Sequence, residues 1–135
     1  MKKILFILIS TIAFIGCDNS DDLSEIFQNR TWKLSFFQEG NTRSIAKEGY
    51  IIRFYENSFT ANTPSGAAIV GNWQADNKNR TLRCTNVRIG EGNIVNDTTA
   101  TKMKLFLEKA SSYNGDANWL QIRQQSHIYM QFHNR

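Results

Sequence analysis

The chain has few of the residues that build metal-bound or covalently cross-linked scaffolds. Its 135 residues include two cysteines, two histidines and one proline. A zinc site needs Cys and His ligands at short, regular spacings. His127 and His133 are six strand residues apart, about 20 Å, so one metal ion cannot bridge them. We therefore predict no metal site and no cofactor, and we place both histidines on the polar face of an edge strand.

Motifs typical of catalysis and of nucleic-acid binding are also missing. No Gly-x-Ser-x-Gly elbow presents a nucleophilic serine, and Gly90-Glu91-Gly92 is far short of a phosphate-binding loop. The glutamates stand at turns or on polar faces, which gives no support to a glycosidase carboxylate pair. Lys and Arg side chains are scattered without a run, so a nucleic-acid partner is not indicated. We predict a protein that is not an enzyme, with an enzyme or an enzyme's inhibitor as the less favoured alternative.

The longest apolar run lies at the N-terminus and is too short to cross a bilayer. Met1-Lys2-Lys3 is followed by the largely apolar residues 4–15, whereas a membrane-spanning helix needs about 20 residues. A positive start before a short apolar run is typical of a secretory signal peptide. A buried N-terminal element is the alternative, but the two lysines and the abrupt change of composition at Asp18 favour a signal peptide over residues 1–16.

The end of this run, Gly16-Cys17, resembles the lipobox of bacterial lipoproteins. The resemblance implies that the peptide is cut before Cys17, that its thiol carries a diacylglycerol and that the new amine is acylated. Two or more acyl chains make a stable anchor, because each buried CH₂ contributes about 0.8 kcal/mol. We therefore expect a lipid-anchored protein of the outer membrane. With Cys17 lipidated, Cys84 has no partner for an intramolecular disulfide.

Residues 17–22 form a lipidated cysteine followed by a short acidic stem. Ser20, Asp21 and Asp22 resemble the export signal that sends some lipoproteins to the outer surface. The same three residues suit the N-terminal end of a helix equally well. The protein is thus expected at the cell surface or facing the periplasm. From Leu23 onward, fourteen basic residues stand against nine acidic ones, so the domain over residues 23–135 is mildly basic.

Hydrophobic periodicity predicts that this domain is mainly β. Apolar residues alternate over 32–36, 50–55, 68–75 and 81–89, and again in a C-terminal hairpin over 120–132. A further short strand is expected over 59–61. The alternation changes parity between Cys84 and Val87, which predicts a bulge near Asn86. The expected fold is a small antiparallel barrel or a strongly curved sheet of about seven to eight strands.

One segment departs from the strand pattern. An apolar stripe with helical spacing favours an amphipathic helix over about residues 98–112, N-capped by Asp97 and placed before the C-terminal hairpin. A strand is the alternative, but it would turn Phe106 to the wrong face. The stripe consists of Ala100, Met103, Phe106, Leu107, Ala110 and Tyr113.

These patterns together resemble a META-type domain, a lipocalin-like barrel that occurs in small bacterial envelope lipoproteins. The likeness rests on the Trp-x-Leu strand at 32–34, on Arg53–Phe59, on Gly71-Asn72-Trp73 and on the helix followed by Met130-Gln131-Phe132. It covers most of residues 28–133. The Met-Glu-Thr-Ala string of that family is absent, and residues 96–100 stand near its place. The resemblance implies a compact antiparallel barrel and supplies no catalytic residues.

Two sets of aromatic residues are candidates for binding. The first set would line a cavity or fill the core, and small barrels usually fill their interiors with side chains: Trp32, Phe36, Tyr50, Phe54 and Trp73. The second set lies on the opposite parity and would form a surface patch where the helix does not cover it: Phe37, Tyr55, Trp119 and Tyr129. We predict a lipid-anchored, non-catalytic binding or interaction module with an unknown envelope protein as partner. A lipocalin-like carrier of a small apolar ligand is the alternative.

Replacing Cys17 by Ser should prevent lipidation and move the protein out of the membrane fraction, because the anchor consists of acyl chains on this residue. Fractionation of cells that express either form measures this directly. An unchanged distribution of the variant would contradict the lipid anchor.

Overall fold

The structure is a computed structural model that describes residues 23–28 and 30–134. The predicted signal peptide, Cys17 and the stem residues Ser20, Asp21 and Asp22 lie outside the described residues. Residues 23–27 are helical, and the elements that follow are nine strands and helix α2. They are β1 (Thr31–Glu39), β2 (Thr42–Ile45), β3 (Ile51–Phe54), β4 (Ser58–Asn62), β5 (Ala68–Asp76), β6 (Thr81–Glu91), α2 (Thr98–Glu108), β7 (Ser112–Gly115), β8 (Trp119–Gln125) and β9 (Ile128–Asn134).

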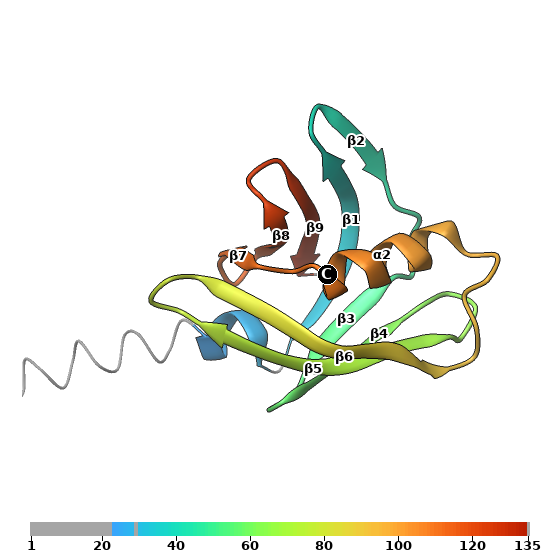
Figure 1. Cartoon of the computed structure of the whole chain (residues 1–135), viewed down its shortest axis with the longest axis horizontal. Helices are drawn as coiled ribbons and strands as arrows, with labels where there is room; N and C mark the ends of the chain where they lie inside the picture. Colours follow the sequence, from blue (N-terminus) through green and yellow to red (C-terminus); the bar gives the residue numbers. More distant parts are fainter. Residues whose placement is uncertain (1–22, 29, 135) are drawn as a thin grey trace, which may run out of the picture.

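The strands form one antiparallel sheet that curves into a ring (Figure 1). The sheet order runs from β2 through β1 and β3 to β9, and β1 pairs with β9 as well. The first half of β1 pairs with β3 and its second half with β2, while β9 runs along its other side. The predicted mainly β fold, with one helix before the C-terminal strands, is confirmed. Because the ring closes, β9 is an inner strand, and the placement of His133 on an edge strand was wrong.

The sequence predicted seven to eight strands, and β2 and β7 are the two that it missed. The β2 segment Thr-Arg-Ser-Ile has no apolar alternation, and three of its four residues are exposed. Its strand conformation comes from backbone pairing with β1, in which Phe36 lies opposite Ile45 and Glu39 opposite Thr42. Such a strand is specified by its neighbour rather than by its own side chains.

Helix α2 begins where the sequence predicts and ends earlier. Asp97 is the N-cap, and its carboxylate accepts a hydrogen bond from the Ala100 backbone N–H at 2.9 Å. The helix ends at Glu108 rather than at 112. Residues 112–115 instead pair with β8, with Tyr113 opposite Ile122, so Tyr113 reaches the core from a strand. Helical spacing and strand pairing both fit this segment, and pairing with β8 decides it.

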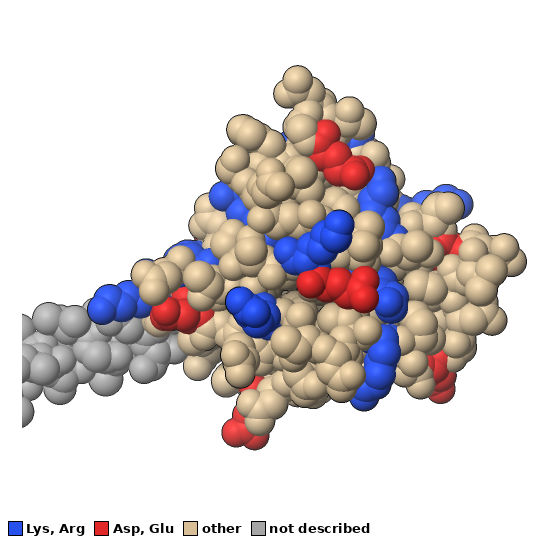
Figure 2. All heavy atoms as spheres, in the orientation of Figure 1, with Lys and Arg blue, Asp and Glu red and all other residues tan. Residues whose placement is uncertain are grey.

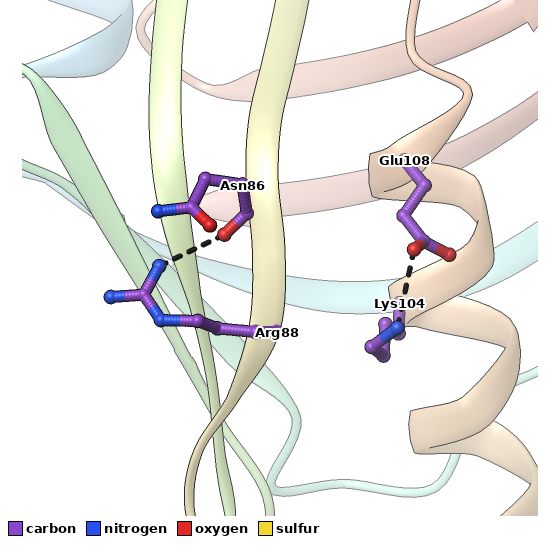
Figure 3. A network of polar contacts seen from close by, with 4 residues as sticks. All are labelled: Asn86, Arg88, Lys104 and Glu108. Carbon is purple, nitrogen blue, oxygen red and sulfur yellow. Dashed lines mark hydrogen bonds and ion pairs between the residues drawn. The ribbon is translucent and has the colours of Figure 1, made fainter.

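Helix α2 packs near the junction of β6 and β7, the two neighbouring strands with the fewest paired residues. Strands β6 and β7 share a single register pair, Thr81 with Ser112, whereas α2 contacts β6, β8 and β9. Its buried side is made by Ala100, Met103, Phe106 and Leu107. Figure 3 shows the helix beside β6, with Lys104 and Glu108 paired on the helix at 3.2 Å. The helix therefore shields a strand edge that the ring leaves largely unpaired.

The predicted bulge near Asn86 is confirmed. Val70 pairs with Arg88 and Asn72 with Thr85, so two residues of β6 lie opposite one residue of β5. Asn86 takes the left-handed conformation, with φ of 54°, which asparagine tolerates better than most residues. The Arg88 guanidinium donates to the backbone oxygen of Asn86 at 2.9 Å (Figure 3). This bulge changes the parity of β6 and bends the strand over the core.

A second bulge, at Ser35, was not predicted and reverses two assignments. Leu34 pairs with Phe132 and Phe36 with Gln131, so β1 carries one extra residue. After the bulge, Phe37 is buried at 3% exposure and contacts Phe106 on α2. Phe36 is only half-buried and faces outward. Because of the bulge, Phe37 faces the core and Phe36 faces outward. The predictions that Phe36 lines the interior and that Phe37 belongs to a surface patch were therefore wrong.

The interior of the ring is filled by aromatic side chains around Phe27. Ile26 and Phe27 come from the helical segment before β1, and both are fully buried. The indole N–H of Trp32 donates to the Ile26 backbone oxygen at 2.7 Å, which fixes this segment against the sheet. Within the described part of the chain, no helix is both long and apolar enough to cross a membrane.

Candidate functional site

The first set of predicted aromatic residues belongs mainly to the packed interior. Trp32, Tyr50, Phe54 and Trp73 are buried. The Phe27 ring stacks on Trp73 at a centroid distance of 4.9 Å and meets Phe54 edge-on at 5.0 Å. The sequence did not single out Phe27, although its helical spacing from Leu23 and Ile26 was a usable signal.

Two of these rings reach surface hollows. Phe54 lines a hollow of about 320 Å³ and Tyr50 lines one of about 360 Å³. None of the five hollows found among the described residues is lined by Phe27, Trp32 or Trp73. The rings contact one another, so they pack the interior in the way expected for a small barrel.

The second set of predicted aromatic residues is divided among three places. Phe37 is in the core, and Tyr55 is exposed beside Glu56, at a hollow lined also by Gln28. Trp119 and Tyr129 are half-buried on β8 and β9. The structure therefore brings Trp119 and Tyr129 onto one sheet face and separates them from Phe37 and Tyr55.

Strands β8, β9, β1 and β2 present one continuous outer face, which we define by register. Arg123, Tyr129, Gln38 and Arg43 form one row across the four strands, and Gln121, Gln131, Phe36 and Ile45 form the next. Trp119, His133 and Lys33 form a third row on β8, β9 and β1. The opposite parity of these strands holds buried residues such as Met130 and Phe132. These eleven residues are called the outer face below.

The charge of the outer face has one sign. Over the surface seen in Figure 2, Lys and Arg side chains are interspersed with Asp and Glu. The outer face, as described, carries Lys33, Arg43 and Arg123 but no Asp or Glu. Three cations without a carboxylate between them favour an anionic partner.

Two aromatic rings lie between two arginines on this face. The Arg43 guanidinium carbon lies 3.9 Å from the centroid of the Phe36 ring. Phe36 meets Tyr129 at a centroid distance of 6.2 Å, and Arg123 lies 5.4 Å from the Tyr129 centroid. Cation–π contacts of this kind hold an arginine in place while its charge remains available to a partner. The sequence could not show this arrangement, because the Ser35 bulge places Phe36 in it.

The two turns at this end of the ring are joined. Gly40 lies in the β1–β2 turn with φ of 65°, and its N–H donates to the backbone oxygen of His127 in the β8–β9 turn at 2.8 Å. A positive φ favours glycine at this position. Arg43 and Tyr129 follow these turns, so the hydrogen bond between the turns helps to fix the position of Arg43 relative to Tyr129.

Two polar atoms of the outer face are buried without a partner in the described structure. They are Nε of Arg123 and Oε1 of Gln121. The Gln121 amide nitrogen is bonded to Oε1 of Gln131 at 3.0 Å. Because unpaired buried polar atoms cost free energy, they are more frequent where a partner or water completes the site.

A serine and a histidine meet at the border of the outer face. Ser35 Oγ and His133 Nδ1 form a hydrogen bond, next to a hollow of about 300 Å³ lined by Lys33, Glu48 and Gly49 among others. A catalytic dyad needs a carboxylate or carbonyl that orients the second ring nitrogen. No such contact to His133 occurs within residues 23–28 and 30–134. We interpret the pair as a polar contact between β1 and β9.

The remaining candidates for reactive chemistry are buried or dispersed. Burial raises the pKa of the Cys84 thiol to about 12, so the thiol stays protonated and poorly nucleophilic at neutral pH. His127 lies in the β8–β9 turn. Among the described residues, no group of three or more His, Cys, Asp or Glu side chains could hold a metal ion.

Tyr50 and Asp97 form a polar contact that the sequence did not predict. The Tyr50 hydroxyl donates to the Asp97 carboxylate, with oxygen distances of 2.7 and 2.8 Å. Burial, followed by the hydrogen bond to Asp97, raises the pKa of Tyr50 to about 12. Because Asp97 also caps α2, the contact ties the start of the helix to the strand region before β3.

Comparisons with known proteins support the fold and assign no activity. The family model described as a domain of unknown function (DUF4847) matches residues 42–134. The chain is similar to the crystal structure of a DUF4847 family protein from Bacteroides vulgatus ATCC 8482, with 22% identity and a TM-score of 0.66, over 84% of this chain and 97% of that one. No curated protein matches. These comparisons show no META-type domain.

The Tyr50 contact predicts a loss of stability at alkaline pH. The pKa is raised from 10 to about 12 on folding, so the unfolded chain releases this proton first as the pH rises. The contribution is complete below pH 10 and is lost as the pH rises from about 10 to about 12. Chemical denaturation of a Tyr50→Phe variant should show a shallower decline over this range. Tyr55→Phe, at an exposed site, is the control, and equal slopes in wild type and Tyr50→Phe would contradict the assignment.

Proposed function

Since the chain belongs to the DUF4847 family and this membership assigns no activity, we propose from its geometry that it is a non-catalytic binding module of the cell envelope. In this proposal residues 1–16 are a signal peptide, Cys17 carries the acyl chains, residues 18–22 are the stem and residues 23–135 are the binding domain. The domain recognises its partner through the outer face of β8, β9, β1 and β2.

The observation that carries the proposal is the composition of the outer face. The half-buried rings of Phe36 and Tyr129 lie between two arginines. Ile45, which pairs with Phe36, is 75% exposed. Aromatic and arginine side chains are enriched where proteins bind partners, because they combine a large contact area with polar groups. A face built only for solubility would carry carboxylates and lysines instead.

The position of the face suits a protein anchored by its N-terminus. The chain enters the domain at the helical segment 23–27, at the lower left of Figure 1, and the β1–β2 hairpin lies at the top. Strand β1 leads from one end to the other over nine residues, about 30 Å. Cys17 precedes Leu23 by six residues, which reach at most about 20 Å. An anchored domain would thus hold Arg43 away from its own membrane.

The alternative of a lipocalin-like carrier has less support. A carrier needs an enclosed space for an apolar ligand, and Phe27 occupies the position between Trp73 and Tyr113 where such a space would lie. We therefore propose recognition by the outside of the ring rather than storage inside it.

Site-specific photo-crosslinking in cells tests the binding face. A benzophenone amino acid at Gln131, in the centre of the face, should give an adduct, whereas the same group at the exposed Thr85 on β6 should not. Arg43→Glu with Arg123→Glu should reduce the Gln131 adduct by about fivefold or more, equivalent to about 1 kcal/mol. Lys78→Glu with Arg83→Glu changes the net charge equally, away from the face, and should leave the adduct unchanged. Equal effects of the two double variants, or equal adducts from both positions, would contradict the proposal.

A further inference from the structure

We propose that the outer face binds an acidic polysaccharide and that Arg43 holds one of its carboxylate or sulfate groups. This inference rests on the proposed function, because it names the partner of the same face. It follows from the fixed position of Arg43, from the spacing of the cations and from the polar groups in the adjacent row.

The Arg43 side chain is held in place before any partner arrives. Its guanidinium lies over the Phe36 ring at 3.9 Å, and its Nε donates to Oε1 of Gln38 at 2.9 Å. The Gln38 amide nitrogen in turn donates to the backbone oxygen of Gly40 at 2.8 Å. The terminal nitrogens of Arg43 have no partner within the described residues. A guanidinium fixed in this way offers two parallel donors to one oxyanion and loses little entropy on binding.

The distance between the arginines points to a polymer. Arg43 and Arg123 stand in one row on β2 and β8, three strand spacings apart, which is roughly 14 Å between their backbones. A single small anion reaches one of them. A chain that repeats an acidic group along its length reaches both, and Lys33 in the third row adds a third cation.

The groups beside the arginines suit sugars. The next row, which includes Gln121, Gln131 and Phe36, presents amides beside the edge of an aromatic ring, and amides donate and accept hydrogen bonds. A pyranose offers hydroxyls at its rim and C–H bonds on its faces, so it can bond the amides and pack on Tyr129 or Trp119. Oε1 of Gln121, buried and unpaired in the described structure, is an acceptor that a sugar hydroxyl could complete after a small movement.

Acidic polypeptides and lipid headgroups fit this face less well. A polypeptide that adds to a sheet needs a free strand edge, and β1, β8 and β9 are paired on both sides. Within the described residues β2 pairs only with β1, and its four residues leave a short edge for such addition. Lipid headgroups would need the face to lie against a membrane, and the β1–β2 hairpin lies at the end of the ring opposite segment 23–27 (Figure 1). Arg43 is on β2 of this hairpin.

The test measures binding of the protein, as purified from cells in non-ionic detergent, to defined probes. Polygalacturonate carries carboxylates, dextran sulfate carries sulfates, and neutral dextran is the uncharged control. Polyglutamate represents an acidic polypeptide, and vesicles with 30% phosphatidylglycerol represent an anionic membrane. Isothermal titration at two salt concentrations gives the affinity of each, because screening weakens binding that depends on charge alone.

Arg43→Lys is the decisive variant, because it keeps the charge and removes the two parallel donors. We expect it to weaken binding of polygalacturonate or dextran sulfate about tenfold, the effect of losing one bidentate contact. Lys78→Ala, in the β5–β6 turn, should change affinity less than twofold. Preference for one acidic polysaccharide identifies the group as carboxylate or sulfate.

Three results would overturn the inference. Equal affinity for neutral dextran would exclude recognition of the acidic group, and tighter binding of polyglutamate or of the vesicles would assign a different partner. Equal affinities of wild type and Arg43→Lys would show that Arg43 acts only through its charge. If these tests fail while the Gln131 crosslink still depends on Arg43 and Arg123, the outer face binds another partner and the proposed function stands.

Discussion

The insertion of Phe27 into the ring is the contact on which the rest of the structure depends. Its ring lies about 5 Å from the centroids of Phe54, Trp73 and Tyr113, and these residues come from β3, β5 and β7. One side chain from the segment before β1 therefore joins strands that are far apart in the sheet. These centroid distances are those of rings in contact, as expected in a close-packed interior. This packing favours the proposal that binding uses the outside of the ring.

Strand β1 connects this packed interior to the proposed binding face. It pairs with β3, β2 and β9, so it closes the ring and carries the hairpin that projects beyond it. The bulge at Ser35 turns Phe37 inward, where it meets Phe106 on α2, and turns Phe36 outward beneath Arg43. A single extra residue thus supplies one ring to the core and one to the proposed site. Strand β1 thus closes the ring and also holds Phe36 beneath Arg43 on the outer face.

Periodicity predicted those parts of the fold in which side chains alone decide the structure. The buried stripe of α2, its cap at Asp97 and the bulge at Asn86 all follow from spacing and parity. The parts that it missed depend on backbone pairing between distant segments: β2 forms against β1, and residues 112–115 leave the helix to pair with β8. Some residues of the candidate site could be predicted from the sequence and others could not. Trp119 and Tyr129 follow from parity, but Phe36 and Arg43 become neighbours only through the Ser35 bulge and the β1–β2 hairpin.

The free energy of unfolding of a Phe27→Ala variant tests the central claim most directly. A fully buried phenylalanine that joins three aromatic residues should cost about 3–5 kcal/mol when it is truncated, because the contacts are lost and a cavity remains. Tyr55→Ala, at a residue that is 49% exposed, should change stability by about 0.5 kcal/mol or less. A loss for Phe27→Ala as small as that for Tyr55→Ala would show that the interior does not depend on this ring, and would reopen it as a place for a ligand.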